Sequence, residues 1–440
     1  MCVRGDKMKK FKIVLLFLIL SLLLCGCSNF RFAGSIDDLI SPISPSGDNA
    51  GVQNAVDEYC KSGYLIKIPS SGDYRTSFIF YDLDGDGQDE AIAFYEPSDS
   101  LATVNMAVLN KVNDKWNVVE NIVGDGTDIN SVDFCDVNND GVTEIIVCWS
   151  VITKSTNLNL EIYRQNKTDD TYKLEKMDDS ITAAEFICAD VNGDHSTDLL
   201  VFTIGSGSES PVAQLYSFES NKKVLLGQTK LDSSIISFSN ITIGESDEGV
   251  SIYADAVRSN GDSMVTEFIY WSDYYDSIVS PFYSYSTGKT SETTRKSIIN
   301  SKDIDSDGIV EIPIDKSVTK LPEQITAQNW MEYSNTVLKH KCYSLSCKRD
   351  GYSLVVGDDD FSDINVKYDN ENRMMTVLSG NQECFNIITI IKSAYNSSDE
   401  KYKNYTEIYS NSGFVYLAEI NDKSSIKVTT QDLKNMIKSY

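Results

Sequence analysis

The sequence predicts a mainly β protein that is built from repeated units of about four antiparallel strands and ends in a small α+β domain. Three observations support this prediction. An acidic nine-residue motif recurs at a nearly constant spacing, apolar segments recur in phase with it, and the periodicity stops after Cys347. Self-similarity at a fixed period is typical of repeat architectures such as propellers and solenoids.

The first copy of the motif runs from Asp82 to Glu90, with carboxylates at positions 1, 3, 5 and 9 and glycine at position 6. Alternating oxygen ligands around a glycine bend are how a loop surrounds Ca²⁺, which takes about six to eight oxygens. Further copies begin at Asp136, Asp190 and Asp303. The motif therefore predicts structural Ca²⁺ sites. Their expected ligands are Asp82, Asp84, Asp86, Glu90, Asp136, Asn138, Asp140, Glu144, Asp190, Asn192, Asp194, Asp198, Asp303, Asp305, Asp307 and Glu311.

The loops are not equivalent. The second (136–144) has the neutral Asn138 at position 3, so we expect weaker binding there. The third (190–198) carries His195 at the bend, where a positive φ costs a non-glycine residue about 1 kcal/mol. A degenerate fourth loop (244–249) keeps Gly249 but loses most ligands, and we expect it to be empty. An acidic turn without metal is the alternative for each loop.

The spacing indicates that the repeat is structural. The first four loops start 54 residues apart and the fifth (303–311) starts 59 residues later. Segments that begin 22 residues after each start are mostly rich in β-branched and aromatic residues, as in half-buried strands. Polar turns and another strand follow, so each repeat has the pattern of a β-propeller blade. Trp271 and Trp330 fall at the same repeat position, and we interpret both as packing between blades.

The four intact loops have the form Asp-x-(Asp/Asn)-x-Asp-(Gly/His)-x-x-(Asp/Glu) between hydrophobic strands. They resemble FG-GAP/VCBS repeats, the units of the integrin α-subunit head and of many secreted bacterial β-propellers. The resemblance covers about residues 55–346. Five repeats are visible, whereas integrin-type propellers have seven blades, so both blade numbers stay open. A strand at 62–68 is a candidate for closing the ring beside the last blade.

The N-terminus predicts export. Four lysines between positions 7 and 12 precede an apolar run at 13–24, which is short for a membrane span and suits a secretory signal. The run ends in Leu24-Cys25-Gly26-Cys27, which resembles a bacterial lipobox and implies diacylation of Cys27. We therefore interpret 1–27 as signal peptide and lipobox, and 28–54 as a proline-punctuated tether. The implied location is the outer side of the cell membrane; an uncleaved anchor is the alternative.

Residues 348–440 are predicted to form the α+β domain, similar to modules that follow VCBS repeats in some Gram-positive surface lipoproteins. Strands are expected at 352–356, 364–367, 374–378, 385–391 and 414–420. A final helix has Thr430 as its expected N-cap and Leu433, Met436 and Ile437 on one face. A short amphipathic helix is expected at 51–60, before the first repeat.

Composition narrows the function classes. The formal charge of −26, with 65 acidic and 39 basic residues, disfavours a nucleic-acid partner. Only two histidines occur, and no nucleophile elbow, phosphate loop or His-Glu-x-x-His helix appears, so no catalytic or organic-cofactor residues are assigned. Seven of the ten cysteines lie outside the signal region, an odd number that argues against a complete disulfide framework. A Cys342–Cys347 pair is left open.

These observations favour a calcium-stabilised cell-surface lipoprotein that binds or scaffolds an unknown surface protein or glycan. An enzymatic role is not favoured. The alternative is a carbohydrate-active lyase or hydrolase on a propeller scaffold, because a fold does not determine a function. A solute-binding lipoprotein usually has two α/β lobes, which the β-rich repeat argues against.

Overall fold

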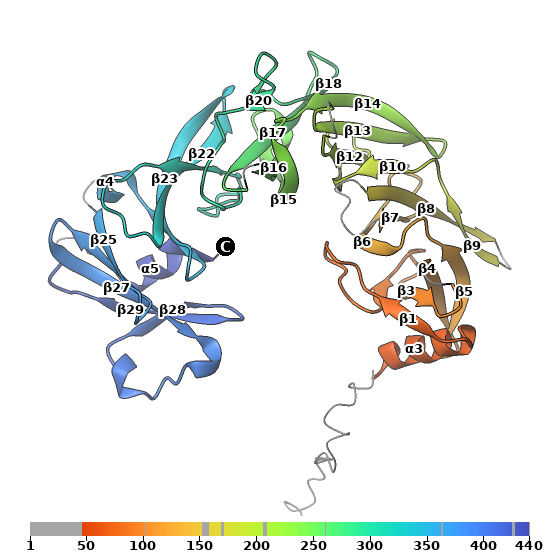
Figure 1. Cartoon of the computed structure of the whole chain (residues 1–440), viewed down its shortest axis with the longest axis horizontal. Helices are drawn as coiled ribbons and strands as arrows, with labels where there is room; N and C mark the ends of the chain where they lie inside the picture. Colours follow the sequence, from red (N-terminus) through yellow and green to blue (C-terminus); the bar gives the residue numbers. More distant parts are fainter. Residues whose placement is uncertain are drawn as a thin grey trace, which may run out of the picture. The chain divides into compact units, whose positions relative to one another are not determined.

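The computed structural model describes residues 46–100, 102–151, 158–168, 171–205, 209–259, 261–361, 364–424 and 427–439. The predicted signal peptide, the lipobox with Cys27 and most of the tether lie outside these residues. Within them, no helix is long and apolar enough to cross a membrane. The described chain is mainly β and contains several antiparallel sheets (Figure 1).

Five sheets follow one another along the repeat region. The first contains β1 (Tyr64–Lys67), β2 (Ile79–Tyr81), β3 (Glu90–Pro97), β4 (Asn105–Val112) and β5 (Lys115–Val123). The second contains β6 (Asp128–Cys135), β7 (Glu144–Ser150), β8 (Leu158–Thr168), β9 (Thr171–Lys176) and β10 (Ile181–Ala183). The third contains β11 (Glu185–Ala189), β12 (Asp198–Thr203), β13 (Val212–Glu219) and β14 (Lys222–Lys230).

The fourth sheet contains β15 (Ile235–Ser246), β16 (Gly249–Arg258), β17 (Met264–Ser272) and β18 (Ser277–Val279). The fifth contains β21 (Ile312–Lys316), β22 (Ile325–Ser334), β23 (Val337–Cys347), β24 (Tyr352–Val356) and β30 (Ile437–Ser439). Between them, β19 (Tyr283–Ser284) and β20 (Lys289–Thr290) form a small hairpin.

The sequence period corresponds to the sheet period. The predicted segments that follow each motif coincide with β4, β8, β13, β17 and β22, which confirms them as strands. In the first three sheets the acidic loop joins the first two strands of the repeat. In the fifth, a bridge between Lys302 and Glu311 closes the loop ahead of β21. Each acidic loop therefore occupies the same connection in its repeat.

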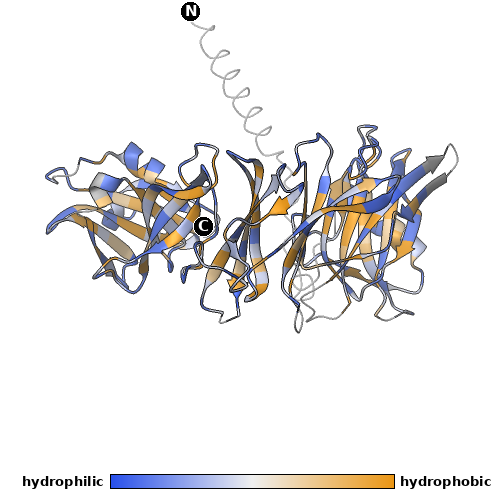
Figure 2. Cartoon of the chain, turned by 90° about the horizontal axis from the view of Figure 1, so that it is seen from above, coloured by the Kyte–Doolittle hydropathy of each residue, from blue (hydrophilic) through white to orange (hydrophobic). Residues whose placement is uncertain are grey.

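Neighbouring repeat sheets pack against one another through clusters of buried apolar side chains, and hydrophobic residues are frequent along their strands (Figure 2). One core cluster joins the first and second sheets, with Phe94 and Trp149 in edge-to-face contact at 5.7 Å between ring centroids. Similar clusters join the second to the third, the third to the fourth and the fourth to the fifth sheet. Since β7 and β12 are covered on both faces, nearly all their side chains are buried.

The N-terminal elements extend the first sheet. The predicted helix is α3 (Asp48–Tyr59), and Glu58 forms an ion pair with Lys115 of β5 at 3.1 Å. β1 pairs antiparallel with β3, from Tyr64 opposite Pro97 to Lys67 opposite Phe94. The expectation that a strand at 62–68 lies beside the last blade is therefore wrong. The same edge of β3 is shared by β1 and β2, which pair with its two halves.

The C-terminal region forms a sixth sheet of β25 (Ile364–Asp369), β26 (Met374–Ser379), β27 (Gln382–Ile391), β29 (Phe414–Ile420) and β28 (Thr406–Ser410), in that order. The five predicted strands are present, and β28 and β30 are additional. The helices of this region are α4 (Asp358–Phe361), η1 (Lys392–Ala394), η2 (Glu400–Tyr402) and α5 (Thr430–Met436). The N-cap of α5 is Thr429, not Thr430, because Thr429 and Asp432 form a reciprocal capping box.

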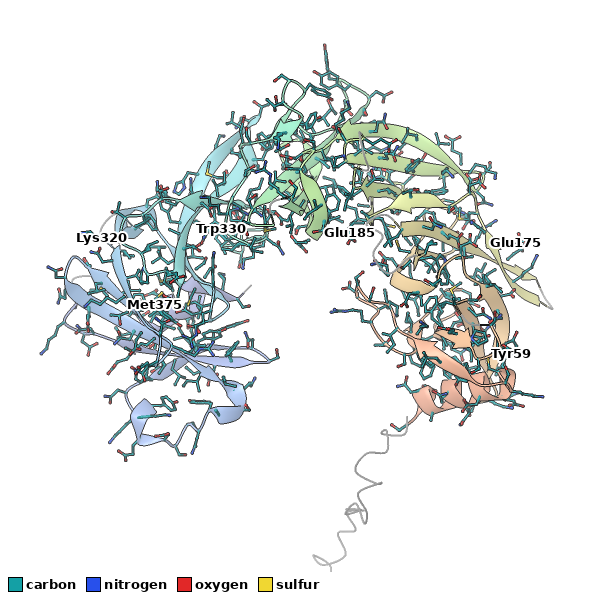
Figure 3. All side chains as sticks on the ribbon, in the orientation of Figure 1. Tyr59, Glu175, Glu185, Lys320, Trp330 and Met375 are labelled. Atoms are coloured by element: carbon teal, nitrogen blue, oxygen red, sulfur yellow. The ribbon has the colours of Figure 1, made fainter. Side chains whose placement is uncertain are left out.

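The fifth and sixth sheets share one core. It extends from Ile325 through Met375 to Ile437, so residues on both sides of position 347 contribute to it (Figure 3). Trp330 is fully buried and donates a hydrogen bond to Ser344 Oγ at 2.8 Å. Trp271 packs on the cluster between the third and fourth sheets. The prediction that both tryptophans pack between repeats is confirmed for Trp271, whereas Trp330 packs within the fifth repeat, against Ile304 and Cys342.

Candidate metal centres and a cavity between the sheets

The four acidic loops share one hydrogen-bond framework. The position-9 carboxylate accepts from the backbone N–H of position 2, which ties the loop to the start of the second strand. These donor–acceptor pairs are Leu83 to Glu90 at 2.9 Å, Val137 to Glu144 at 3.0 Å, Val191 to Asp198 at 3.2 Å and Ile304 to Glu311 at 3.0 Å. The position-1 aspartate accepts from the N–H of position 6 at 2.8–3.0 Å in every loop. Part of the ligand set is thus pre-oriented by the backbone.

Two sharp bends give each loop its shape. Position 6 has a positive φ in all four loops, and His195 has φ +71° as its position in the motif predicted. Position 4 also has a positive φ in every loop, which the motif did not predict; Asn139 and Ser306 occupy it in the second and fifth loops. The glycines at position 4 of the first and third loops were the available signal, because only glycine adopts this conformation without cost.

Two loops gather three carboxylates. Oxygens of Asp82, Asp84 and Asp86 lie within 4.8 Å of one another in the first loop, and so do oxygens of Asp303, Asp305 and Glu311 in the fifth. Glu90 and Asp307 do not belong to these triads. Among the described residues, the second and third loops form no comparable group of three. Position 3 is an asparagine in both, Asn138 and Asn192.

The residues present fit a hard cation. Glu311 is fully buried, and its Oε1 has no hydrogen-bond partner within the described structure. Asp190 and Asp198 each have one such oxygen in the third loop. A buried acceptor without a partner costs about 1–3 kcal/mol, and more when it is charged. An oxygen-seeking cation such as Ca²⁺ would accept these atoms as ligands.

The electrostatics of the loops support the same conclusion. Burial raises the pKa of the three position-9 glutamates to about 7, although the backbone N–H of position 2 opposes this shift. Burial also raises the pKa of Asp198 to about 6. The remaining loop carboxylates raise these pKa values further. Charged forms are therefore disfavoured in the bare loop, and a cation would reverse this preference.

Basic side chains contact the second and the fifth loops. In the fifth loop, Lys341 of β23 donates a hydrogen bond to Asp307, and its Nζ lies 3.3 Å from Glu332 Oε2 and 3.7 Å from Asp305 Oδ2. In the second loop, an Arg164 nitrogen lies 2.8 Å from Asp140 Oδ2. Both cations reach the position-5 carboxylate from later strands of the same sheet.

The loops also contact the following sheet. Gln165 Nε2 of β8 donates to the Leu83 carbonyl at 2.5 Å. Asn138 of the second loop donates to Asn221, in the turn between β13 and β14, at 3.0 Å. In the degenerate fourth loop, Asp247 accepts from the N–H of Asn335 in the fifth sheet at 2.9 Å. In these repeats the loop therefore also links its own sheet to the next one by hydrogen bonds.

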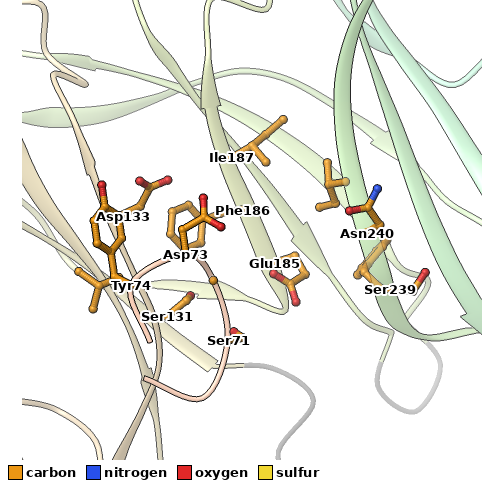
Figure 4. A pocket seen from close by; sticks show the side chains of 14 residues that line it. Ser71, Asp73, Tyr74, Ser131, Asp133, Glu185, Phe186, Ile187, Ser239 and Asn240 are labelled. Carbon is orange, nitrogen blue, oxygen red and sulfur yellow. The ribbon is translucent and has the colours of Figure 1, made fainter. Parts of the chain in front are cut away.

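A cavity of about 370 Å³ lies where the edge strands β6, β11 and β15 meet the segment before β2 (Figure 4). Its walls carry the carboxylates of Asp73, Asp133 and Glu185 beside the rings of Tyr74 and Phe186. Burial raises the pKa of Asp133 and of Glu185. A second cavity of about 360 Å³ shares Glu185 with the first. No sequence motif indicated these residues, because only packing brings the three edge strands together.

Cys342 and Cys347 do not form a disulfide. Cys342 packs with Ile304 and Trp330, whereas Cys347 belongs to the core shared with the sixth sheet and donates to Asp350 at 3.3 Å. Both lie on β23 at an odd separation, and alternate residues of a strand point to opposite faces. The two thiols are therefore buried in different clusters.

No protein family model and no curated protein matches the sequence. Among solved structures, the chain is similar to Sqt1 from Chaetomium thermophilum, with 9% identity over 68% of each chain and a TM-score of 0.33. It is also similar to the exotype rhamnogalacturonan lyase YesX, with 12% identity over 67% of this chain and 71% of that chain and a TM-score of 0.26. At these TM-scores, neither similarity assigns a function.

Proposed function

We propose that this protein is a calcium-stabilised surface lipoprotein that binds a protein or glycan ligand. The observation that carries the proposal is the recurrence of one hydrogen-bonded acidic loop at the same connection of four repeats, with a carboxylate triad in two of them. Such recurrence at equivalent positions favours a structural metal over a single regulatory site.

Calcium would act on the fold. In the first loop the ion would be held by Asp82, Asp84 and Asp86, and in the fifth by Asp303, Asp305 and Glu311. The bound ion supplies positive charge, which removes repulsion among carboxylates and gives the buried Glu311 oxygen a partner. A ligand that binds only the folded state stabilises it by RT ln(1 + [Ca²⁺]/Kd).

The five repeat sheets are proposed as the blades of a β-propeller. Each repeat contributes consecutive antiparallel strands, and each sheet packs against the next through an apolar cluster. Five blades fit the five repeats, and the sixth sheet lacks the acidic loop.

The cavity between β6, β11 and β15 is the proposed ligand site. Carboxylate and amide oxygens accept hydrogen bonds from sugar hydroxyls, and Asp133, Glu185 and Asn240 place such groups on its walls. The rings of Tyr74 and Phe186 offer apolar faces for the C–H groups of a sugar. A glycan is therefore the favoured ligand class.

A carbohydrate-active enzyme is the second candidate. Asp133 and Glu185 line the same cavity, and burial raises the pKa of each. A carboxyl group with a raised pKa can act as a general acid, and paired carboxylates carry out glycoside chemistry.

The metal proposal is tested by thermal unfolding of the full chain in Ca²⁺ and in EDTA. A melting temperature that rises with Ca²⁺ and falls with chelator is expected. Identical curves in the two conditions would remove calcium from the proposal.

The ligand proposal is tested with a glycan array and the variants Asp133→Asn and Glu185→Gln. Binding of the wild type to a glycan on the array without release of shortened sugars would support a binding function. Loss of that binding in both variants would support the cavity as the ligand site. Release of shortened sugars by the wild type, abolished by Glu185→Gln, would support the enzyme instead.

The lipoprotein proposal rests on the lipobox and is tested separately. Incorporation of labelled palmitate into the wild type and its absence in Cys27→Ala are expected. Labelling of the Cys27→Ala variant would contradict acylation at this residue.

A further inference from the structure

The fifth acidic loop carries a cation of its own. Lys341 contacts Asp307 and lies close to Asp305, so its ammonium is placed on two of the four acidic side chains of the loop. The lysine side chain is 24% exposed. A lysine side chain carries a positive charge at neutral pH.

A bulge in β23 directs Lys341 to the loop. Trp330 pairs with Cys342, and the next residue, Met331, pairs with His340. Lys341 is therefore the extra residue, without an opposite partner on β22. A β-bulge re-aims the side chain at its position. The contact with the loop thus results from an irregularity in the backbone and does not depend on side-chain flexibility alone.

The ammonium also explains the composition of the triad. Asp303, Asp305 and Glu311 gather their oxygens, whereas Asp307, at position 5 of the motif, is engaged by Lys341 instead. A divalent ion that enters this loop meets a positive charge close to Asp305. To gain Asp307 as a ligand, the ion must displace the ammonium or share the carboxylate with it.

We propose that Lys341 is a resident counter-cation that sets the affinity of the fifth loop for a divalent ion. The inference rests on the proposed metal function and deepens it. In the absence of metal, Lys341 neutralises part of the loop and links it to β22 through Glu332. When metal binds, the same charge opposes the ion, so the fifth loop exchanges its ion more readily than its acidic ligand set implies.

The third loop gives an internal contrast. Its four ligand candidates contact no lysine or arginine in the described part of the chain; the nearest basic group is His195, 3.9 Å from Asp190. Arg164 on Asp140 repeats the arrangement of the fifth loop in the second. Resident cations thus accompany some loops and not others.

Terbium luminescence can isolate the fifth loop. Trp330 packs against Ile304, the position-2 residue of this loop, and is positioned to sensitise a Tb³⁺ ion bound there. The part of the signal that disappears in Trp330→Phe belongs to the fifth loop. Titration of the full-length chain in detergent with Tb³⁺, and displacement by Ca²⁺, then give the affinity of this site.

The decisive variant is Lys341→Met, which keeps the length of the side chain and removes its charge. Because the variant removes the repulsion between the ammonium and the ion, Tb³⁺ should bind the fifth loop about tenfold more tightly than in the wild type. In EDTA the variant should melt at a lower temperature than the wild type. Lys341→Arg should retain affinity near that of the wild type.

Lys339→Met is the matched control, since Lys339 lies on the same strand and donates to Ser334 outside the loop. Its Tb³⁺ affinity should not change. Equal affinities of Lys341→Met and the wild type, with a clear Trp330-dependent signal, would overturn this inference and leave the metal function intact. Absence of any Trp330-dependent signal in both proteins would overturn the metal function of this loop and the inference with it.

Discussion

The fourth and fifth loops are neighbours that stabilise the same connection in different ways. An isolated parallel bridge links Glu245 of the fourth loop to Ile309 of the fifth. The fifth loop is a nine-residue acidic turn with a buried, unpartnered Glu311 oxygen. The fourth is a tight hairpin that closes between Ser246 and Gly249 and uses hydroxyl and backbone donors. The fifth loop therefore concentrates negative charge that a counter-ion would stabilise, whereas the fourth loop is held by neutral hydrogen bonds.

Gly244 explains why the fourth loop has no aspartate at position 1 of the motif. It stands where the other loops have the position-1 aspartate, and a Cβ at this position would lie 2.8 Å from a methyl group of Val310. The neighbouring loop therefore occupies the space that a ligand side chain would need. Asp247 replaces the lost function in part, because it accepts from Ser334 and Asn335 and so still links the fourth sheet to the fifth.

The fourth sheet instead contains an ion pair in its interior. Asp255 of β16 and Arg295 are both fully buried and lie 2.7 Å apart. Asp255 also accepts from Thr266 at 2.6 Å and from the N–H of Ser301 at 2.6 Å. Arg295 belongs to the long connection that precedes the fifth loop. The fourth sheet thus pairs its buried carboxylate with a guanidinium of the same chain, whereas the fifth loop has a buried Glu311 oxygen without a hydrogen-bond partner among the described residues.

The largest expected effect comes from breaking this internal pair. Asp255→Ala leaves a buried guanidinium without its partner and should destabilise the protein by about 3–5 kcal/mol. Urea unfolding followed by tryptophan fluorescence measures the loss, which should be equal in Ca²⁺ and EDTA. Asp273→Ala, in the exposed turn between β17 and β18, is the control. A loss of stability that differs between Ca²⁺ and EDTA would contradict the interpretation that Asp255 is stabilised by Arg295 and not by a metal ion.

The second expected effect, also in the fourth sheet, is a pH dependence of the free energy of unfolding. Burial raises the pKa of Glu267 to about 7 from a usual 4.5, against hydrogen bonds from Asp232 N–H, Ser280 and Thr290. Because the folded state holds this proton more tightly, its stabilisation is complete below about pH 4.5 and is lost as the pH rises through about 7. The loss should amount to roughly 3 kcal/mol.

Glu267→Gln should remove that dependence, since an amide cannot titrate. The measurement is the difference in unfolding free energy between the wild type and the variant from pH 4.5 to 8, in EDTA. The exposed Glu292→Gln is its control. A difference that does not change with pH would show that Glu267 has an ordinary pKa.

The metal-dependent contrast between the two loops is expected to be somewhat smaller. Glu311→Gln should abolish the contribution of the fifth loop to calcium stabilisation, which is about 2.7 kcal/mol when [Ca²⁺] is 100 times Kd. Asp247→Asn in the fourth loop should leave the calcium gain unchanged. Thermal unfolding with and without Ca²⁺ compares them. Equal calcium gains in wild type and Glu311→Gln would remove Glu311 from the ligand set.

The smallest effect concerns backbone strain in the third loop. His195 has φ +71°, so His195→Gly should stabilise the metal-free protein by about 0.5–1 kcal/mol. Asn139→Gly, at φ +57° in the second loop, should gain less, because asparagine tolerates this conformation. The urea concentrations at the unfolding midpoint, measured in EDTA, compare the stability gains of the two variants. A greater gain for Asn139→Gly would show that the strain lies elsewhere.

The acidic motif and the strand pattern made much of the fold predictable. The spacing of Asp82, Asp136 and Asp190 follows the repeat sheets, and the segments after each loop are strands. The predictions were wrong or incomplete for strands whose place in a sheet depends on pairing with residues far away in the sequence. β1 joined the first sheet, and β30 was invisible as a strand because the short segment 437–439 gains its partner only through β24. The N-cap of α5 shifted by one residue because Thr429 and Thr430 are adjacent and both can cap.

The acidic loops were predictable from the sequence, because their carboxylates and bends are local and each oxygen lies within nine residues of the others. The surroundings of the loops, in contrast, depend on contacts between distant parts of the chain. Lys341 reaches the fifth loop through a bulge, Val310 excludes a side chain at Gly244, and the cavity residues meet through the packing of three sheets. Spacing along a chain encodes contacts within a turn, whereas contacts between sheets depend on distances that only folding sets.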